Sequence, residues 1–90
     1  MSAMKGMDTG VVSQWAKTVA GTDLPQVEQL ITKVCNEATG LPWTGSDFDT
    51  FVTTDVAEVQ QKLTLLTAAI NQMASTASKN ASEQETTSAS

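Results

Sequence analysis

The middle of the chain reads Gly40-Leu41-Pro42-Trp43-Thr44-Gly45-Ser46, and this stretch decides the fold. Gly40 predicts the end of a helix, as a left-handed C-cap residue would. Pro42 then forbids the helix to continue, because proline lacks the backbone N–H and clashes with the preceding turn. Ser46 is a favoured N-cap, and Asp49 lies three residues further on, in the capping-box position. The stretch therefore predicts a turn between two helices.

The segment after the turn carries the most regular apolar pattern in the sequence. Apolar residues recur there at steps of three and four, which is the period of a helix with a heptad seam. The seam consists of Val52, Val56, Val59, Leu63, Leu66, Ile70, Met73 and Ala77. Phe48 extends it by one turn, and Phe51 and Leu65 widen it. We therefore predict a helix over about 46–82, with a stripe that suits a bundle of more than two helices.

The segment before the turn shows the same period with one interruption. Its stripe consists of Val12, Trp15, Val19, Val27, Leu30, Val34 and Ala38, and Asp8 or Thr9 can serve as the N-cap. Gly21 and Pro25 interrupt it, because both residues are unfavourable in a helix interior. One interpretation is a single helix over about 8–39, kinked near 21–25. The other is two helices, the second capped by Asp23. Because the stripe keeps its phase across the interruption, we favour the kinked helix.

These elements predict an all-α fold, an antiparallel two-helix hairpin over 8–82 with its turn at 41–46. We expect residues 1–7 to form a flexible lead. We expect residues 83–90 to be disordered, because a polar tail cannot offset its ordering entropy by burial. A chain of this length buries only about 60–65% of its unfolded surface, and two helices bury less. We therefore predict that a partner chain completes the core.

The composition argues against several classes of function. Ten carboxylates against five lysines give a net charge of −5, which disfavours binding to nucleic acids and to anionic membranes. The chain has no histidine and a single cysteine, Cys35. We therefore expect no metal site, no cofactor, no disulfide within the chain and no enzymatic activity. No apolar run of about 18 residues occurs, so we expect no membrane span, and no cleavable signal of the general secretory kind is evident.

The tripeptide Trp43-Thr44-Gly45 in the predicted turn has two interpretations. In the first, Gly45 permits a tight corner and the Trp43 indole plugs the open end of a helical bundle. In the second, the tripeptide marks a family of hairpin proteins. Its place near mid-chain, between two long helical segments, favours the second interpretation.

The sequence resembles the Trp-x-Gly family of small type VII secretion proteins, the early-secreted-antigen-like proteins of actinobacteria and firmicutes. The resemblance covers roughly residues 4–85, and its head and tail are similar to the actinobacterial branch. It rests on Lys5-Gly6-Met7-Asp8, on Gln29, Ile31 and Val34, on Trp43-Thr44-Gly45 with Asp47 and Phe51, on Leu63 and Ala68-Ala69, and on Asn80-Ala81 before Glu83-Gln84. Together these elements make the match specific.

The resemblance implies that hairpins pair into four-helix bundle dimers, as homodimers or as heterodimers with a paralogue. It implies that the folded dimer leaves the bacterial cytoplasm through a membrane machine driven by an ATPase. Outside the cell, or at its envelope, such a protein is an effector or an export partner. The family's export signal is a tyrosine followed four residues later by an acidic residue. This chain has no tyrosine, which favours a heterodimer whose other chain carries the signal.

We expect the hairpin and dimer interfaces to use the apolar stripes of both helices. The residues concerned are Val52, Val56, Val59, Leu63, Leu66, Ile70 and Met73, together with Trp15, Leu30 and Val34. Two other classes of function fit a helical hairpin. One is an intracellular helical adaptor or coiled-coil scaffold, and the other is a membrane-active pore former, which the acidic polar face disfavours.

Overall fold

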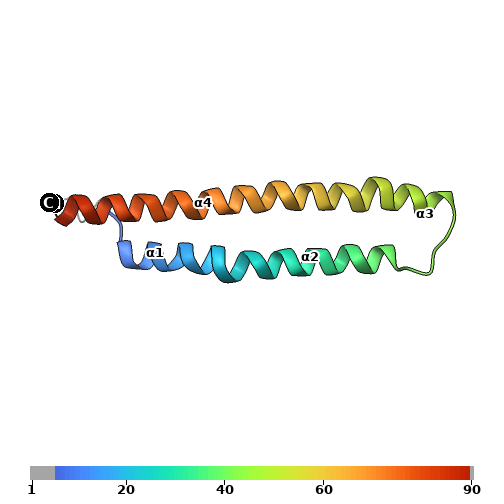
Figure 1. Ribbon diagram of the computed structural model, residues 1–90, viewed down its shortest axis with the longest axis horizontal. Coiled ribbons are helices and arrows are strands. Elements are labelled where there is room, and N and C mark those ends of the chain that lie inside the picture. Colours follow the sequence, from blue (N-terminus) through green and yellow to red (C-terminus); the bar gives the residue numbers. More distant parts are fainter. Residues whose placement is uncertain (1–5, 90) are drawn as a thin grey trace.

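The computed structural model describes residues 6–89 as two helical arms that lie antiparallel (Figure 1). The first arm consists of α1 (Thr9–Thr18), the π-helical segment η2 (Val19–Asp23) and α2 (Leu24–Thr39). The second consists of α3 (Ser46–Thr50), the π-helical segment η3 (Phe51–Val56) and α4 (Ala57–Ala89). The hairpin measures 66 × 18 × 16 Å, and residues 6–89 contain no strand. The prediction of an all-helical hairpin is confirmed.

The first arm begins as predicted and ends differently. The Asp8 carboxylate caps α1 by accepting a hydrogen bond from the Val11 N–H at 3.2 Å. At the other end, Gly40 has φ −97° and ψ 7°, so the prediction of a left-handed cap is wrong. The Gly40 N–H donates to the carbonyls of Asn36 and Glu37, and these bonds close the helix without a positive φ.

Helical conformation continues through the interruption at Gly21 and Pro25, so the interpretation as two helices is wrong. Asp23 has helical φ and ψ, and its side chain makes no capping hydrogen bond. The Leu24 N–H donates to the Val19 carbonyl, five residues back, which is the bond of a π turn. Val19 and Leu24 are both buried. The π turn thus takes up one extra residue and keeps the apolar stripe facing the second arm.

The sharp corner of the hairpin lies at Gly45, whose φ of 114° is the one positive φ among the described residues. Gly45 also occupies the cap position of α3, and its carbonyl accepts a hydrogen bond from the Asp49 N–H at 3.1 Å. The prediction that Ser46 is the N-cap is wrong. Ser46 is the first helical residue, and no side chain caps α3. The Asp49 N–H, which the Ser46 hydroxyl was expected to cap, donates to the Gly45 carbonyl instead.

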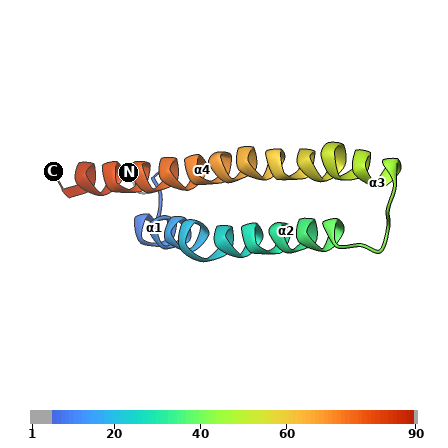
Figure 2. The same ribbon diagram turned by 45° about the vertical axis from the view of Figure 1, so that its right-hand side comes forward.

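The second arm is longer than predicted, because α4 continues to Ala89. The expected disorder is therefore wrong for 83–89, where no glycine or proline interrupts and glutamate, glutamine and alanine favour helix. Figures 1 and 2 both show α4 running past the start of α1. Residues 1–5 and 90 lie outside the described residues. Of the predicted flexible lead, only Gly6 and Met7 are described, and both precede the first helix.

The arms contact each other mainly through small side chains. The buried residues are Ala16, Val19, Leu24 and Cys35 of the first arm, and Val56, Ala74 and Ala81 of the second. Ile70 packs against the cluster formed by Ala16, Val19 and Ala74. Along α4 the side that faces the first arm, which we call the inner row, consists of Leu63, Thr67, Ile70, Ala74, Ala77 and Ala81, with Val56 preceding it in η3. No large side chain of the described residues is fully buried, so the hairpin has a thin core of its own.

Candidate interaction surface

Many large apolar side chains of the hairpin face solvent, each between 41% and 70% exposed. They are Val11, Trp15, Leu30 and Val34 on the first arm, Leu41 and Trp43 in the turn, and Val59, Leu65, Leu66 and Met73 on the second arm. Single exposed apolar residues are normal on a protein surface. A series of them along both arms is unusual and is typical of an interaction surface.

On both arms several of the exposed apolar residues come directly before inward-facing ones. Trp15 precedes Ala16, Val34 precedes Cys35, Leu66 precedes Thr67 and Met73 precedes Ala74. One residue is a rotation of about 100° around a helix. Because the arms face each other and run in opposite directions, this rotation brings both sets to the same side of the hairpin. We call that side the apolar side, and it consists of Trp15, Leu30, Val34, Val59, Leu66 and Met73.

A groove on the apolar side supports this placement directly. It has a volume of about 140 Å³ and almost no polar lining. Its walls are Val34, Cys35 and Ala38 of α2, Phe51, Asp55 and Val56 of η3, and Val59 of α4. Val34 and Val59 therefore lie on the same side of the hairpin. Cys35 is a free, buried thiol in the wall of this groove.

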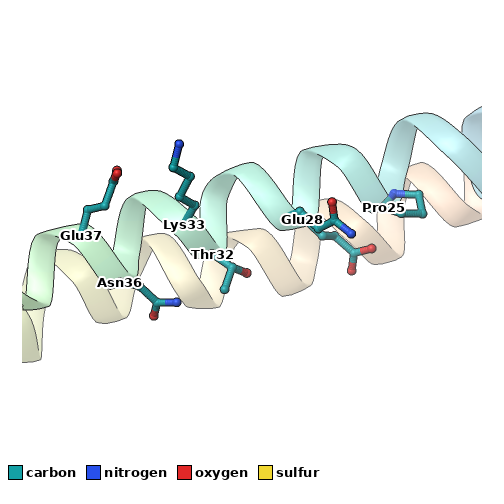
Figure 3. Close-up of a pocket in the computed structure, with 7 residues that line it drawn as sticks. Pro25, Glu28, Thr32, Lys33, Asn36 and Glu37 are labelled. Atoms are coloured by element: carbon teal, nitrogen blue, oxygen red, sulfur yellow. The ribbon is translucent and has the colours of Figure 1, made fainter.

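The opposite side of the hairpin is polar. A hollow between the arms is lined by Lys17, Asn71, Ser75 and Ser78 together with Ala16, Ala20 and Ala74. A second, open hollow lies along α2 alone, and Figure 3 shows its polar side chains, with Lys33 and Glu37 pointing one way and Thr32 and Asn36 another. One helix cannot enclose a ligand, so this second hollow offers no enclosed binding site.

The turn carries an aromatic cluster. The ring of Trp43 lies 5.2 Å from that of Phe51 and 5.5 Å from that of Phe48, in tilted arrangements that favour aromatic pairs. The indole therefore packs on the first turns of the second arm, and 41% of the residue remains exposed. Gly45 supplies the corner that lets Trp43 reach these rings, which explains why the two residues occur together.

The predicted seam of the second arm contributes to two different surfaces. Val56, Leu63, Ile70 and Ala77 face the first arm, whereas Val59, Leu66 and Met73 belong to the apolar side, and Val52 is half-buried. Trp15, Leu30 and Val34 of the first arm also belong to the apolar side. The sequence pattern did not indicate Thr67, whose hydroxyl oxygen is buried in the inner row without a hydrogen-bond partner.

Negative charge gathers at the turn end of the hairpin. Between Lys33 and Lys62 the sequence contains Glu37, Asp47, Asp49, Asp55 and Glu58 and no lysine. Glu58 forms an exposed ion pair of 3.3 Å with Lys62, one helical turn away. Asp47 and Asp49 lie in the first turn of α3, where the helix dipole favours negative charge. The turn end is therefore acidic, as well as aromatic.

Over the described residues, no group of three or more His, Cys, Asp or Glu side chains could hold a metal ion. In the same part of the chain, no helix is long and apolar enough to cross a membrane. Comparisons with protein-family models, with curated proteins and with solved structures give no match to this chain. The apolar side and the turn are therefore the two features of the hairpin that bear on its function.

Proposed function

We propose that this chain is a non-enzymatic Trp-x-Gly protein of a type VII secretion system, exported as a folded helical dimer. The single observation that carries the proposal is the apolar side, which runs along both arms of a hairpin whose own core is thin. A second hairpin laid on this side would form a four-helix bundle and would remove those side chains from water. Trp43 and Gly45, placed together in the turn, support the family assignment.

The size of the apolar side supports a stable pair. A hairpin of 66 by 18 Å presents a broad face along its whole length. Stable complexes bury about 800 Å² on each partner, and a face of these dimensions exceeds that area. The partner is a paralogous Trp-x-Gly protein or a second copy of the chain, and the secretion ATPase engages the dimer. In this proposal the protein is an effector or an export partner, found in the cytoplasm before export and then secreted or attached to the cell envelope.

Export is tested in the native bacterium with and without an active secretion ATPase. We expect the chain in the culture supernatant of the parent strain and only in the cell pellet of the ATPase-deficient strain. A cytoplasmic marker enzyme, measured in the same supernatants, controls for lysis. If the chain stays in the pellet of both strains, the proposal fails, and an intracellular helical adaptor or scaffold becomes the better interpretation of the same apolar side.

A further inference from the structure

We propose that the turn end of the hairpin binds a basic peptide segment of another protein, with one apolar side chain in the groove and lysine or arginine side chains beside Trp43. The inference goes beyond the proposed function, because it concerns a partner other than a paired hairpin. Three observations support it, namely the size of the groove, its continuity with the aromatic cluster, and the excess of negative charge around both.

The groove suits a single apolar side chain. Its volume is about 140 Å³, whereas pockets for drug-sized ligands occupy roughly 300–1,000 Å³. The lining is almost entirely apolar and comes from both arms, with Val34 on α2 and Val59 on α4. Asp55 is the one carboxylate in the wall. An aliphatic side chain that enters this groove therefore brings its neighbours in sequence close to a negative charge.

The aromatic cluster of the turn continues the groove. Phe51 lines the groove, and the centroid of its ring lies 5.2 Å from that of Trp43. Trp43 is held by Phe48 and Phe51 and is still 41% exposed. Among aromatic side chains an indole is the best partner for a lysine or arginine cation. A peptide whose apolar residue fills the groove can therefore place a neighbouring cation on Trp43.

The charge around the groove and the indole selects a basic partner. All the charged side chains between Lys33 and Lys62 in the sequence are carboxylates, and Asp55 in the groove wall is one of them. Lys62 itself is paired with Glu58 at 3.3 Å. An acidic segment would meet like charges at this end, whereas a basic one meets opposite charges, which favour encounter and specificity.

This surface leaves room for the dimer of the proposed function. The groove lies at the turn end of the apolar side, where it uses Val34 and Val59. Trp15, Leu66 and Met73 lie further toward the open end of the hairpin. A peptide in the groove therefore leaves most of the apolar side to a paired hairpin.

The test titrates the purified chain into fluorescein-labelled peptides and follows their fluorescence anisotropy. The probe has one leucine between two pairs of arginines, and two control peptides replace the arginines by glutamates or the leucine by serine. We expect saturable binding of the probe with a dissociation constant below about 1 mM, and binding about tenfold weaker for each control. Absence of saturable probe binding up to about 1 mM would overturn the proposal, and so would equal binding of either control.

Two charge variants locate the binding site on the chain. Asp55→Asn removes the carboxylate from the groove wall and is expected to weaken probe binding about threefold, as loss of an exposed ion pair does. Asp23→Asn makes the same change in η2, away from the groove, where the side chain caps no helix. It should leave the dissociation constant unchanged. Equal weakening by both variants, with unchanged far-ultraviolet circular dichroism, would overturn the site.

Tryptophan fluorescence gives a second measurement that needs no change in the groove. In Trp15→Phe, Trp43 is the one tryptophan left, and its emission is expected to change as the probe binds. In Trp43→Phe, Trp15 reports instead, and its emission is expected to stay constant. A constant Trp43 emission at saturating probe, or a change at Trp15 alone, would overturn the placement at the turn. The export test follows the location of the chain in the culture, so failure of either proposal is distinguishable from failure of the other.

Discussion

Gly45 is the residue on which the corner of the hairpin depends. Its φ of 114° and ψ of −179° lie in a region that is essentially restricted to glycine. A Cβ added there would meet nothing within 4 Å, so a substitution acts through the backbone alone. We expect Gly45→Ala to lower the free energy of unfolding by about 1–3 kcal/mol, measured by urea titration at a fixed protein concentration.

Gly21 provides the matched control for Gly45. It lies in the π turn with no positive φ, and an added Cβ would again meet nothing within 4 Å. We expect Gly21→Ala to raise the free energy of unfolding by about 0.5–1 kcal/mol, because alanine loses less backbone entropy in a helix. If both variants lowered stability equally, the conformation of Gly45 would not be the cause of its effect.

Trp43 holds the turn to the second arm through Phe48 and Phe51. We expect Trp43→Ala to lower the free energy of unfolding by about 1–3 kcal/mol and to weaken the near-ultraviolet circular dichroism signal, since two aromatic contacts are lost. Trp43→Phe keeps an aromatic ring at the site and should retain most of the stability. An unchanged denaturation curve for Trp43→Ala would show that the cluster contributes nothing to the fold.

At the scale of the elements, the helical period could be predicted from the sequence, but the residues that face the other arm could not. Apolarity ranks Leu66 and Met73 above Thr67 and Ala74, so the pattern placed the larger residues in the seam. Two helices that approach closely select small side chains between them. Thr67 and Ala74 face inward for that reason, and the large side chains are displaced to the apolar side. The apolar period alone therefore does not separate the residues that face the other arm from those that remain exposed.

The sequence predicts the two π segments to different extents. Gly21 and Pro25 predicted an interruption of the first helix. That the interruption is a π turn depends on the five-residue spacing of Val19 and Leu24, and the predicted apolar stripe did not include Leu24. The segment η3 has no comparable signal. There the Thr53 hydroxyl donates to the carbonyl of Asp49 at 2.8 Å, a bond that bends helices but does not predict a π turn.

The extra residue of η2 leads to a prediction about deletions. In a Pro25→Ala background, which removes the proline penalty, deleting Gly21 converts the five-residue spacing of Val19 and Leu24 to four. Four residues also bring two side chains to one face of an α-helix. We expect this deletion variant to keep its helical circular dichroism, with a melting temperature no lower than that of the background.

Deleting Thr32 in the same background is the control, because it removes one residue from the regular helix α2. The residues that follow then turn by about 100°, which takes Cys35 and Ala38 away from the second arm. The lost burial should cost about 2 kcal/mol or more and lower the melting temperature by about 8 °C or more. Equal melting temperatures for the two deletion variants would contradict the role given to the π turn.

At the scale of the whole molecule, the thin core and the broad apolar side both follow from which side chains lie between the two arms. The side chains that two arms bury are mostly small, and several of the largest apolar ones remain in solvent. In the proposed dimer, burial of those larger side chains adds to the stability of the single hairpin. Chain length predicts a partner chain, and this stays a prediction. The side of the hairpin that keeps its large apolar residues exposed could not be predicted, because it depends on which residues the arms place between them.

The melting temperature should therefore depend on the protein concentration. If the chain pairs with itself, a 100-fold increase in concentration stabilises the folded dimer by about 2.7 kcal/mol, which predicts a rise in melting temperature of about 5–10 °C. Leu66→Asp places a charge on the apolar side. The melting temperature of this variant should be lower and independent of concentration, because a buried unpaired charge opposes association. Thr64→Asp carries the same charge on the polar side and should retain the concentration dependence of the parent. If the parent melts at one temperature over the whole range, the hairpin is stable without a second copy, and the exposed residues serve a different partner.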